Sequence, residues 1–163
     1  MQLNTLLKSL GKEIIRRYPY INCGGCCVYA AIITEELHKL NIPAGGIVTT
    51  WDTPEYVDID TIRHRVKSNA INEWRSKGVN FTHVGVEFTY NNRKYHYDSE
   101  GCNLASKKFR EYKVYNGRLQ LQEMKELTQR QRGWNTRFLR KDIPAIRKFV
   151  KFYFNMHKDK ING

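Results

Sequence analysis

Near the start of the chain, apolar side chains recur at the three- and four-residue spacing of an amphipathic helix. These positions are Leu3, Leu6, Leu7, Leu10, Ile14 and Ile15. Side chains at this spacing lie on one face of a helix and can pack against a core. Pro19 interrupts the pattern because proline lacks a backbone N–H. The sequence therefore predicts a helix over residues 3–17.

A second and more apolar helix is predicted to begin at Cys26, directly after two glycines. The run CVYAAIITEELHKL that follows carries apolar side chains at Val28, Ala31, Ile32, Leu37 and Leu40. Such a wide apolar surface is typical of a helix buried at the centre of a domain. Asn41 and Pro43 end the helix, and residues 44–51 (AGGIVTTW) then favour a short strand, since β-branched side chains follow the glycines.

Two further segments show helical periodicity. Residues 59–77 place apolar side chains at Ile59, Ile62, Val66, Ala70, Ile71 and Trp74, and Gly78 ends the pattern. Near the end of the chain, Asp142 and Pro144 open a helix whose apolar stripe is Ile143, Ile146, Phe149, Val150, Tyr153 and Phe154. Proline is favoured in the first turn of a helix, where its missing N–H has no partner in any case. Both segments are therefore predicted to be helical.

The clearest strand signal is a hairpin formed by THVGVEFTY and RKYHYDSEG around Asn91 and Asn92. Asparagine tolerates the positive φ angles of a tight hairpin turn. With the turn at this pair, antiparallel pairing brings His83 opposite approximately Asp98 to Glu100. A histidine and a carboxylate from distant positions are thereby predicted to be neighbours.

These elements indicate an α+β fold in which a helix precedes an antiparallel sheet and further helices surround it. The 163 residues form one domain by this reading, residues 1–163, with a basic C-terminal extension at about 103–163. Residues 103–135 are polar and basic, and no periodic pattern assigns them to an element.

Lys and Arg outnumber Asp and Glu by 28 to 16, which gives a formal charge of +12. Such a charge attracts nucleic acid, anionic lipid or an acidic protein. No segment approaches the roughly 20 apolar residues of a membrane span, so neither a membrane anchor nor a secretory leader is expected. We expect a cytoplasmic protein whose four cysteines stay reduced, which leaves catalysis, metal binding or burial as their roles.

Cys26 occupies the position at which a protein can activate a thiol. The N-terminus of a helix and a neighbouring histidine both lower the pKa of a cysteine, and the thiolate is the nucleophile. Gly24 and Gly25 allow a tight turn and a close approach of the backbone to a bound carbonyl. His83 is the candidate base, and Asp98 is the carboxylate that would orient its ring.

At these residues the chain resembles the transglutaminase-like proteins of the papain-like cysteine protease superfamily. GGCCVYAAIITEELHKLNIPAGGIV is similar to their core motif, and HVGVEFTYNNRKYHYDSEG to their His strand and the Asp that follows it. Alignment on Ala30 and on Ile-Pro-Ala at 42–44 selects Cys26 over Cys27 as the nucleophile. The resemblance implies a Cys-His-Asp triad on a papain-like fold, in which the Cys-bearing helix packs on an antiparallel sheet. The chain departs from the family pattern at Gly45, Gly85 and Ser99.

Papain-like enzymes also use a side-chain donor to the oxyanion a few residues before the cysteine. Here Tyr18, Tyr20 and Asn22 occupy that stretch, Trp51 can reach from the next strand, and Tyr20 is favoured. Cys27 is a further candidate beside the substrate, although free cysteines are most often small buried side chains.

Other interpretations of the same residues stay open. Cys23 and Cys26 form a CxxC pair that could bind zinc together with His96 and Cys102, but no second pair at zinc-finger spacing exists. A thioredoxin-like redox motif would need a βαβ pattern around the CxxC, which is missing. His96 shares a strand face with Asp98 and is a fallback base if the hairpin register differs.

The sequence thus predicts thiol-dependent acyl transfer or hydrolysis of a protein or peptide substrate, which the basic surface suggests is acidic, without metal or cofactor. Water as the acceptor makes the protein a peptidase or amidase, and an amine makes it a transglutaminase. The alternative is a non-catalytic basic protein on the same scaffold that holds nucleic acid or an acidic partner.

Overall fold

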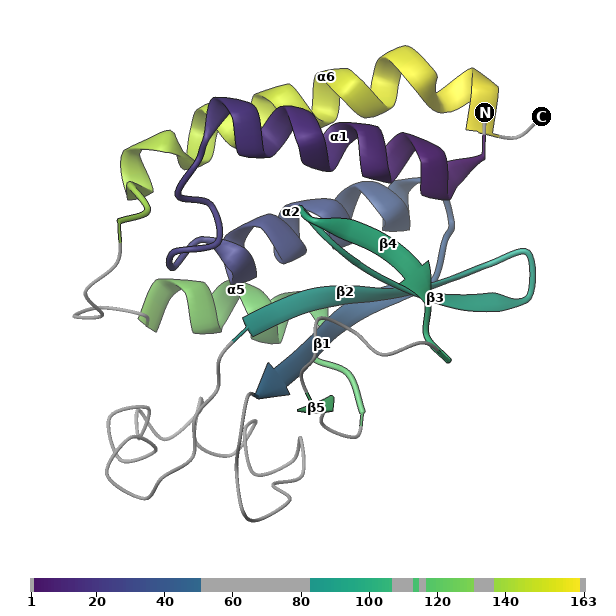
Figure 1. Ribbon diagram of the computed structural model, residues 1–163, viewed down its shortest axis with the longest axis horizontal. Coiled ribbons are helices and arrows are strands. Elements are labelled where there is room, and N and C mark those ends of the chain that lie inside the picture. Colours follow the sequence, from purple (N-terminus) through teal and green to yellow (C-terminus); the bar gives the residue numbers. More distant parts are fainter. Residues whose placement is uncertain (1, 51–82, 107–112, 115–116, 131–136, 162–163) are drawn as a thin grey trace.

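The computed structural model describes residues 2–50, 83–106, 113–114, 117–130 and 137–161 (Figure 1). Within these residues the helices are α1 (Leu3–Arg17), α2 (Cys26–Lys39), α5 (Leu121–Arg130), the 3₁₀ helix η1 (Arg140–Asp142) and α6 (Ile143–Ile161). The strands are β1 (Ala44–Thr50), β2 (His83–Tyr90), β3 (Arg93–Asp98), β4 (Gly101–Leu104) and β5 (Lys113–Val114). The fold is α+β, as the sequence predicts.

The strands form one antiparallel sheet in the order β4-β3-β2-β1-β5. The β2–β3 hairpin has the predicted register, since Val86 pairs with Tyr97 and Tyr90 with Arg93. Asn91 and Asn92 both have positive φ angles, 50° and 59°, which a type I′ turn requires. The two asparagines therefore set the pairing that places the far ends of the hairpin strands.

Helix α2 lies between the sheet and an outer pair of helices, α1 and α6 (Figure 1). It contacts β1 and β2 on one side and α5 and α6 on others. Its residues from Cys27 to Thr34 are all buried, which explains why its sequence is apolar on nearly every side. Replacing a core side chain here, such as Ile33, by alanine would cost roughly 2–5 kcal/mol.

The C-terminal helix α6 is part of this core. Ile146, Val150 and Phe154 on its inner stripe are almost completely buried. The hydroxyl of Tyr153 donates to Ser9 Oγ on α1 at 2.8 Å, and the Arg17 guanidinium lies 4.2 Å from the centre of the Phe149 ring. The last predicted helix thus packs against the first one.

The loop before α2 is held by the segment that leads into α6. The Phe138 N–H donates to the Cys23 carbonyl at 3.2 Å. A Cβ at position 25 would lie 2.6 Å from the Phe138 ring and 2.7 Å from the Ile21 carbonyl oxygen, so only glycine fits there. Position 24 also requires glycine, because its φ angle is 109°. The turn that precedes Cys26 therefore has one tightly packed shape.

The sequence did not predict some elements of the structure, and some of its predictions concern residues that the structure does not describe. Strand β4 and helix α5 fall in or beside a region that showed no periodic pattern. The helix expected over 59–77 and Trp51 lie outside the described residues. Among the helices described, none combines the length and apolar character that crossing a bilayer demands.

Candidate active site

Cys26 is the first residue of α2, and it lies at one end of the sheet beside the start of β2. Burial raises the pKa of its thiol, but a hydrogen bond from His83, the charge of His83 and backbone N–H groups of Val84 and Cys27 outweigh burial. The pKa of Cys26 is therefore lowered. The side chain stays partly accessible. Cys26 is thus a partly exposed residue whose thiol ionises more readily than that of an ordinary cysteine.

His83 and Asp98 form a buried pair behind this thiol. His83 Nε2 donates to Asp98 Oδ2 at 2.9 Å, and each side chain is only 4% exposed. Asp98 Oδ1 also accepts the Glu100 N–H at 2.8 Å, which holds the carboxylate in place. Burial by itself would lower the pKa of His83, but the hydrogen bonds to Asp98 and Cys26 outweigh burial and raise the pKa to about 9. The imidazolium form is therefore favoured at neutral pH.

The hairpin register explains how these two side chains meet. Extending the pairing of Val86 with Tyr97 by one residue puts Gly85 opposite Asp98. His83 precedes Gly85 by two positions and so shares its side of the strand, diagonal to Asp98. Because Gly85 has no side chain, nothing on that strand stands between the ring and the carboxylate. The departure from the family pattern at Gly85 therefore lies at the centre of the site.

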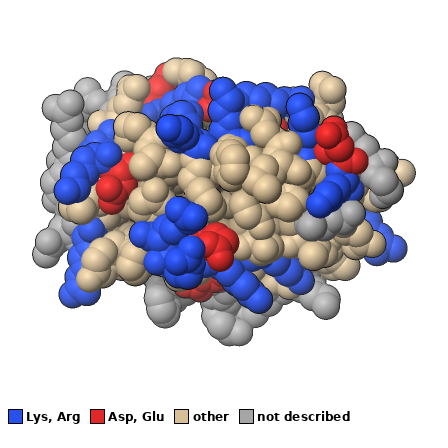
Figure 2. All heavy atoms as spheres, turned by 90° about the horizontal axis from the view of Figure 1, so that it is seen from above, with Lys and Arg blue, Asp and Glu red and all other residues tan. Residues whose placement is uncertain are grey.

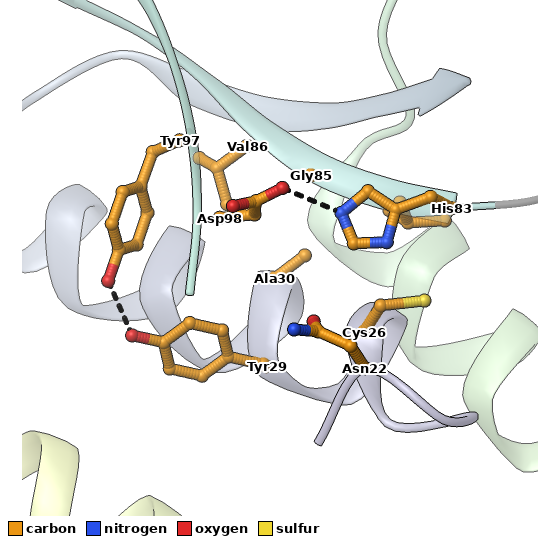
Figure 3. Close-up of a pocket in the computed structure, with 10 residues that line it drawn as sticks. Asn22, Cys26, Tyr29, Ala30, His83, Gly85, Val86, Tyr97 and Asp98 are labelled. Carbon is orange, nitrogen blue, oxygen red and sulfur yellow. Dashed lines mark hydrogen bonds and ion pairs between the residues drawn. The ribbon is translucent and has the colours of Figure 1, made fainter. Parts of the chain in front are cut away.

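Ten residues line the pocket around these groups: Asn22, Cys26, Tyr29, Ala30, His83, Val84, Gly85, Val86, Tyr97 and Asp98. In Figure 3 one ring nitrogen of His83 faces Asp98, and the other lies on the side of Cys26. Since Nε2 is bonded to the carboxylate, Nδ1 is the nitrogen that serves the thiol. The structure thus brings together all three residues of the predicted triad.

Asn22 is the predicted oxyanion candidate that the structure places in the pocket (Figure 3). Its Oδ1 accepts the Ser99 hydroxyl at 3.0 Å, and its Nδ2 donates to Glu100 Oε1 at 3.4 Å. These contacts tie the loop before α2 to the turn after Asp98. Ser99, a second departure from the family pattern, therefore positions the amide of Asn22.

The other candidates lie elsewhere. Tyr20 is 48% exposed and is not among the residues that line the pocket; its ring centre is 5.8 Å from the Arg137 guanidinium. Cys27 is buried, its thiol donates to the Met124 carbonyl at 3.5 Å, and burial raises its pKa to about 12. Trp51 is outside the described residues. The structure does not bring Tyr20 to the triad because its side chain turns outward from the loop.

Two tyrosines at the back of the pocket were not expected from the sequence. The hydroxyls of Tyr29 and Tyr97 are hydrogen-bonded at 2.5 Å, and both side chains are buried (Figure 3). Burial raises the pKa of both phenols, so they stay neutral. Tyr29 lies three residues after Cys26 on the same helix, and this spacing was the one signal that could have indicated its place beside the site. The place of Tyr97 depends on how the sheet packs against α2.

The residues of the alternative interpretations are separated. Cys23 is exposed in the loop, whereas Cys102 is buried on β4. His96 Nε2 is bonded to Glu87 Oε2 at 3.0 Å, away from the pocket. In the part of the chain that the structure describes, no three His, Cys, Asp or Glu side chains are grouped as metal ligands.

Comparisons with known proteins add no family to this description. No family model matches the chain, and searches of curated proteins and of solved structures returned no significant match.

Proposed function

We propose that this protein is a thiol-dependent enzyme that hydrolyses or transfers acyl groups, with Cys26 as nucleophile, His83 as acid and base, and Asp98 as the orienting carboxylate. The observation that carries the proposal is the position of a pKa-lowered thiol at a helix N-terminus beside a buried His83–Asp98 pair. A nucleophile, a base and an orienting group in this order are the components of a catalytic triad. The papain-like fold suggested by the sequence belongs to the same proposal.

The chemistry follows from the protonation states of the pair. The Cys26 thiolate attacks the carbonyl carbon of an amide or ester, and the carbonyl oxygen becomes an oxyanion. The His83 imidazolium gives its Nδ1 proton to the leaving amine or alcohol as the C–N or C–O bond breaks, which leaves a thioester on Cys26. His83 then removes a proton from water or from an acceptor amine, and attack on the thioester releases the product and regenerates the thiolate.

Two kinds of donor are near the position of the oxyanion. Backbone N–H groups in the first turn of a helix have no partner within the helix, and here that turn begins at Cys26. The amide of Asn22 has two N–H donors, one of which is directed at Glu100. We propose Asn22 as the side-chain donor in place of Tyr20, because Asn22 lines the pocket and Tyr20 does not.

Selective alkylation tests this proposal. At pH 6 an ordinary thiol is roughly 1% thiolate or less, so iodoacetamide should modify Cys26 far faster than an unactivated cysteine. Cys23 and Cys27 are matched internal references, since the first is exposed and the second is the buried neighbour of the nucleophile. The modified residues are identified by mass spectrometry of tryptic peptides. If Cys26 reacted no faster than Cys23, the proposed nucleophile would be wrong.

A second candidate function rests on the charge of the outer helices. Figure 2 shows Lys and Arg side chains spread over the face that carries α1 and α6, with few acidic groups between them. The basic side chains of these two helices are Lys8, Lys12, Arg16, Arg17, Arg147, Lys148, Lys151, Lys158 and Lys160, against Glu13 and Asp159. This surface suits a basic binding protein that contacts nucleic acid or an acidic partner. Such a protein would show no preferential alkylation of Cys26.

A further inference from the structure

A second hollow lies along the loop that precedes Cys26 and the segment that leads into α6. Its walls include Arg17, Tyr20, Ile21, Arg137, Phe138 and Leu139, and its volume is about 70 Å³. The pocket around Cys26 has a volume of about 0 Å³ by the same measure. The hollow is therefore the roomier of the two.

The hollow combines apolar walls with two cationic groups. Of its lining residues, Ile21 and Phe138 are buried, whereas Tyr20 and Leu139 are large apolar side chains that stay about half exposed. Isolated exposed apolar residues are common, but two of them around one hollow mark a contact surface more strongly.

Arg17 and Arg137 supply the positive charge of this hollow. The Arg17 guanidinium stacks on Phe149 at 4.2 Å from the ring centre, and its Nε lies 3.8 Å from Glu13 Oε2, which leaves the Nη groups to meet a ligand. The Arg137 guanidinium lies 5.8 Å from the centre of the Tyr20 ring. A stacked guanidinium keeps its N–H edge available for a planar carboxylate, which is the pairing that arginine makes best. Asp142 is the one acidic side chain among the described lining residues, so the cationic groups outnumber it.

Residues that line the hollow contact the turn that directly precedes the candidate nucleophile. The backbone N–H of Phe138 donates to the Cys23 carbonyl, and the Phe138 ring packs against Gly25, which directly precedes Cys26. Tyr20 and Ile21 form its wall, while Asn22 of the same loop lines the pocket of the triad. The hollow and the pocket of the triad therefore share the loop that leads into α2.

We propose that this hollow is an exosite that binds an acidic segment of the protein substrate, away from the bond that is cleaved or transferred. Aspartate or glutamate carboxylates of the segment pair with Arg17 and Arg137, and an apolar side chain between them enters the hollow beside Tyr20 and Leu139. The inference rests on the proposed thiol-dependent function, for which it names the substrate class.

Peptide binding tests the exosite directly. The probe is a fluorescein-labelled hexapeptide in which leucine is flanked by glutamates, and the matched probe has glutamine in place of each glutamate. Fluorescence anisotropy should show that the protein prefers the glutamate peptide, and that Arg17→Gln or Arg137→Gln weakens its binding by about threefold to tenfold, since a charge-assisted hydrogen bond is lost. Arg16→Gln is the control: Arg16 is the exposed neighbour of Arg17 and does not line the hollow, and it makes the shorter contact with Glu13, at 2.8 Å against 3.8 Å for Arg17.

The outcomes separate the exosite from the enzyme. Preferential alkylation of Cys26 in the wild-type protein tests the thiol chemistry without reference to the hollow. If Cys26 is activated but the glutamate and glutamine peptides bind equally, or Arg16→Gln weakens binding as much as Arg17→Gln, the exosite is refuted alone. The exosite is also refuted if a single-stranded oligonucleotide binds more tightly than the glutamate peptide with the same dependence on Arg17 and Arg137. Thermal unfolding of each variant verifies that the fold is retained.

Discussion

The β2–β3 hairpin carries two histidine–carboxylate pairs with nearly equal hydrogen-bond distances. At its open end His83 Nε2 is 2.9 Å from Asp98 Oδ2, and nearer the turn His96 Nε2 is 3.0 Å from Glu87 Oε2. By distance and residue type alone, either pair could be the base and orienting group of a triad.

Their surroundings differ in two respects. The first pair is 4% exposed on both sides, whereas the Glu87 side chain is 16% exposed and has the Arg118 guanidinium at 3.7 Å. The hydrogen bond from His96 lowers the pKa of Glu87 more than burial raises it. Only the first pair lies beside a thiol at a helix N-terminus. A hydrogen-bonded histidine and acid therefore become a candidate catalytic unit only when a thiol lies beside them. The following predictions test the difference between the two pairs.

The largest effect is expected from removing each histidine in turn. His83→Ala should slow acyl-enzyme formation by about 10⁴-fold, because it removes the general acid and base. His96→Ala should leave the rate nearly unchanged. The measurement is the rate at which a p-nitrophenyl ester acylates Cys26, followed by intact-protein mass spectrometry. Equal and negligible effects of both substitutions would favour the basic binding protein over the enzyme.

Exchange of each carboxylate for its amide should have a smaller effect. Asp98→Asn keeps the shape of the side chain but no longer stabilises the imidazolium, and acylation should slow by about 10²-fold, the lower end of the acid–base range. Glu87→Gln is the matched control and should acylate at the wild-type rate. If Glu87→Gln slowed acylation more than Asp98→Asn, Glu87 would be the orienting carboxylate and the assignment of Asp98 would be wrong.

The pH dependence of alkylation is expected to shift by a smaller factor. In the wild type the pKa of Cys26 is lowered and that of His83 is raised to about 9, so the thiolate–imidazolium pair should extend to lower pH than the thiolate of an ordinary cysteine. In Asp98→Asn the imidazolium loses its anion, so the pKa of Cys26 rises by about one unit, and iodoacetamide labelling at pH 6 slows about tenfold. An unchanged pH profile would show that Asp98 has no influence on the thiol.

The smallest effect is on stability, and its sign differs between the two pairs. The raised pKa of His83 stabilises the fold fully below its unfolded value of 6.5, and this contribution is lost as the pH rises through about 9. The free energy of unfolding relative to His83→Gln should therefore fall by on the order of 1–3 kcal/mol over that range. The lowered pKa of Glu87 acts in the opposite direction: its contribution is present above 4.5 and is lost as the pH falls. Urea titrations from about pH 3 to about pH 10 cover both ranges, and a loss on the same side for both pairs would contradict the assignment.

The hairpin and the central helix were predictable because local chemistry dictates them. Asn91 and Asn92 adopt the positive φ angles that a two-residue turn demands, and this turn sets the register that joins His83 to Asp98. The start of α2 at Cys26 follows from the glycines before it and the apolar run after it. Strand β4 and helix α5 were missed because their short or polar sequences gain their structure from β3 and α2, against which they pack.

The oxyanion candidates show where local reasoning ends. Tyr20 and Asn22 are two residues apart in one loop, and the sequence does not reveal which side chain turns inward. The structure directs Asn22 into the pocket because Ser99 and Glu100, from the turn after β3, bond to its amide. Tyr20 is left on the outside beside Arg137, whose segment returns to this loop from the other end of the chain.

The sequence by itself determined the α+β class, the helix that begins at Cys26 and the neighbourhood of His83 and Asp98, because periodicity, glycine and asparagine act over a few residues. The resemblance to the transglutaminase-like motif selected Cys26 over Cys27, but only the tertiary structure supplies the physical difference between the two thiols. Cys26 meets His83 and the N–H of Val84, which lower its pKa, whereas Cys27 is buried against α5 and its pKa rises to about 12. The charge state of a thiol depends on groups brought near it by the fold, and those groups lie more than fifty residues away along the chain.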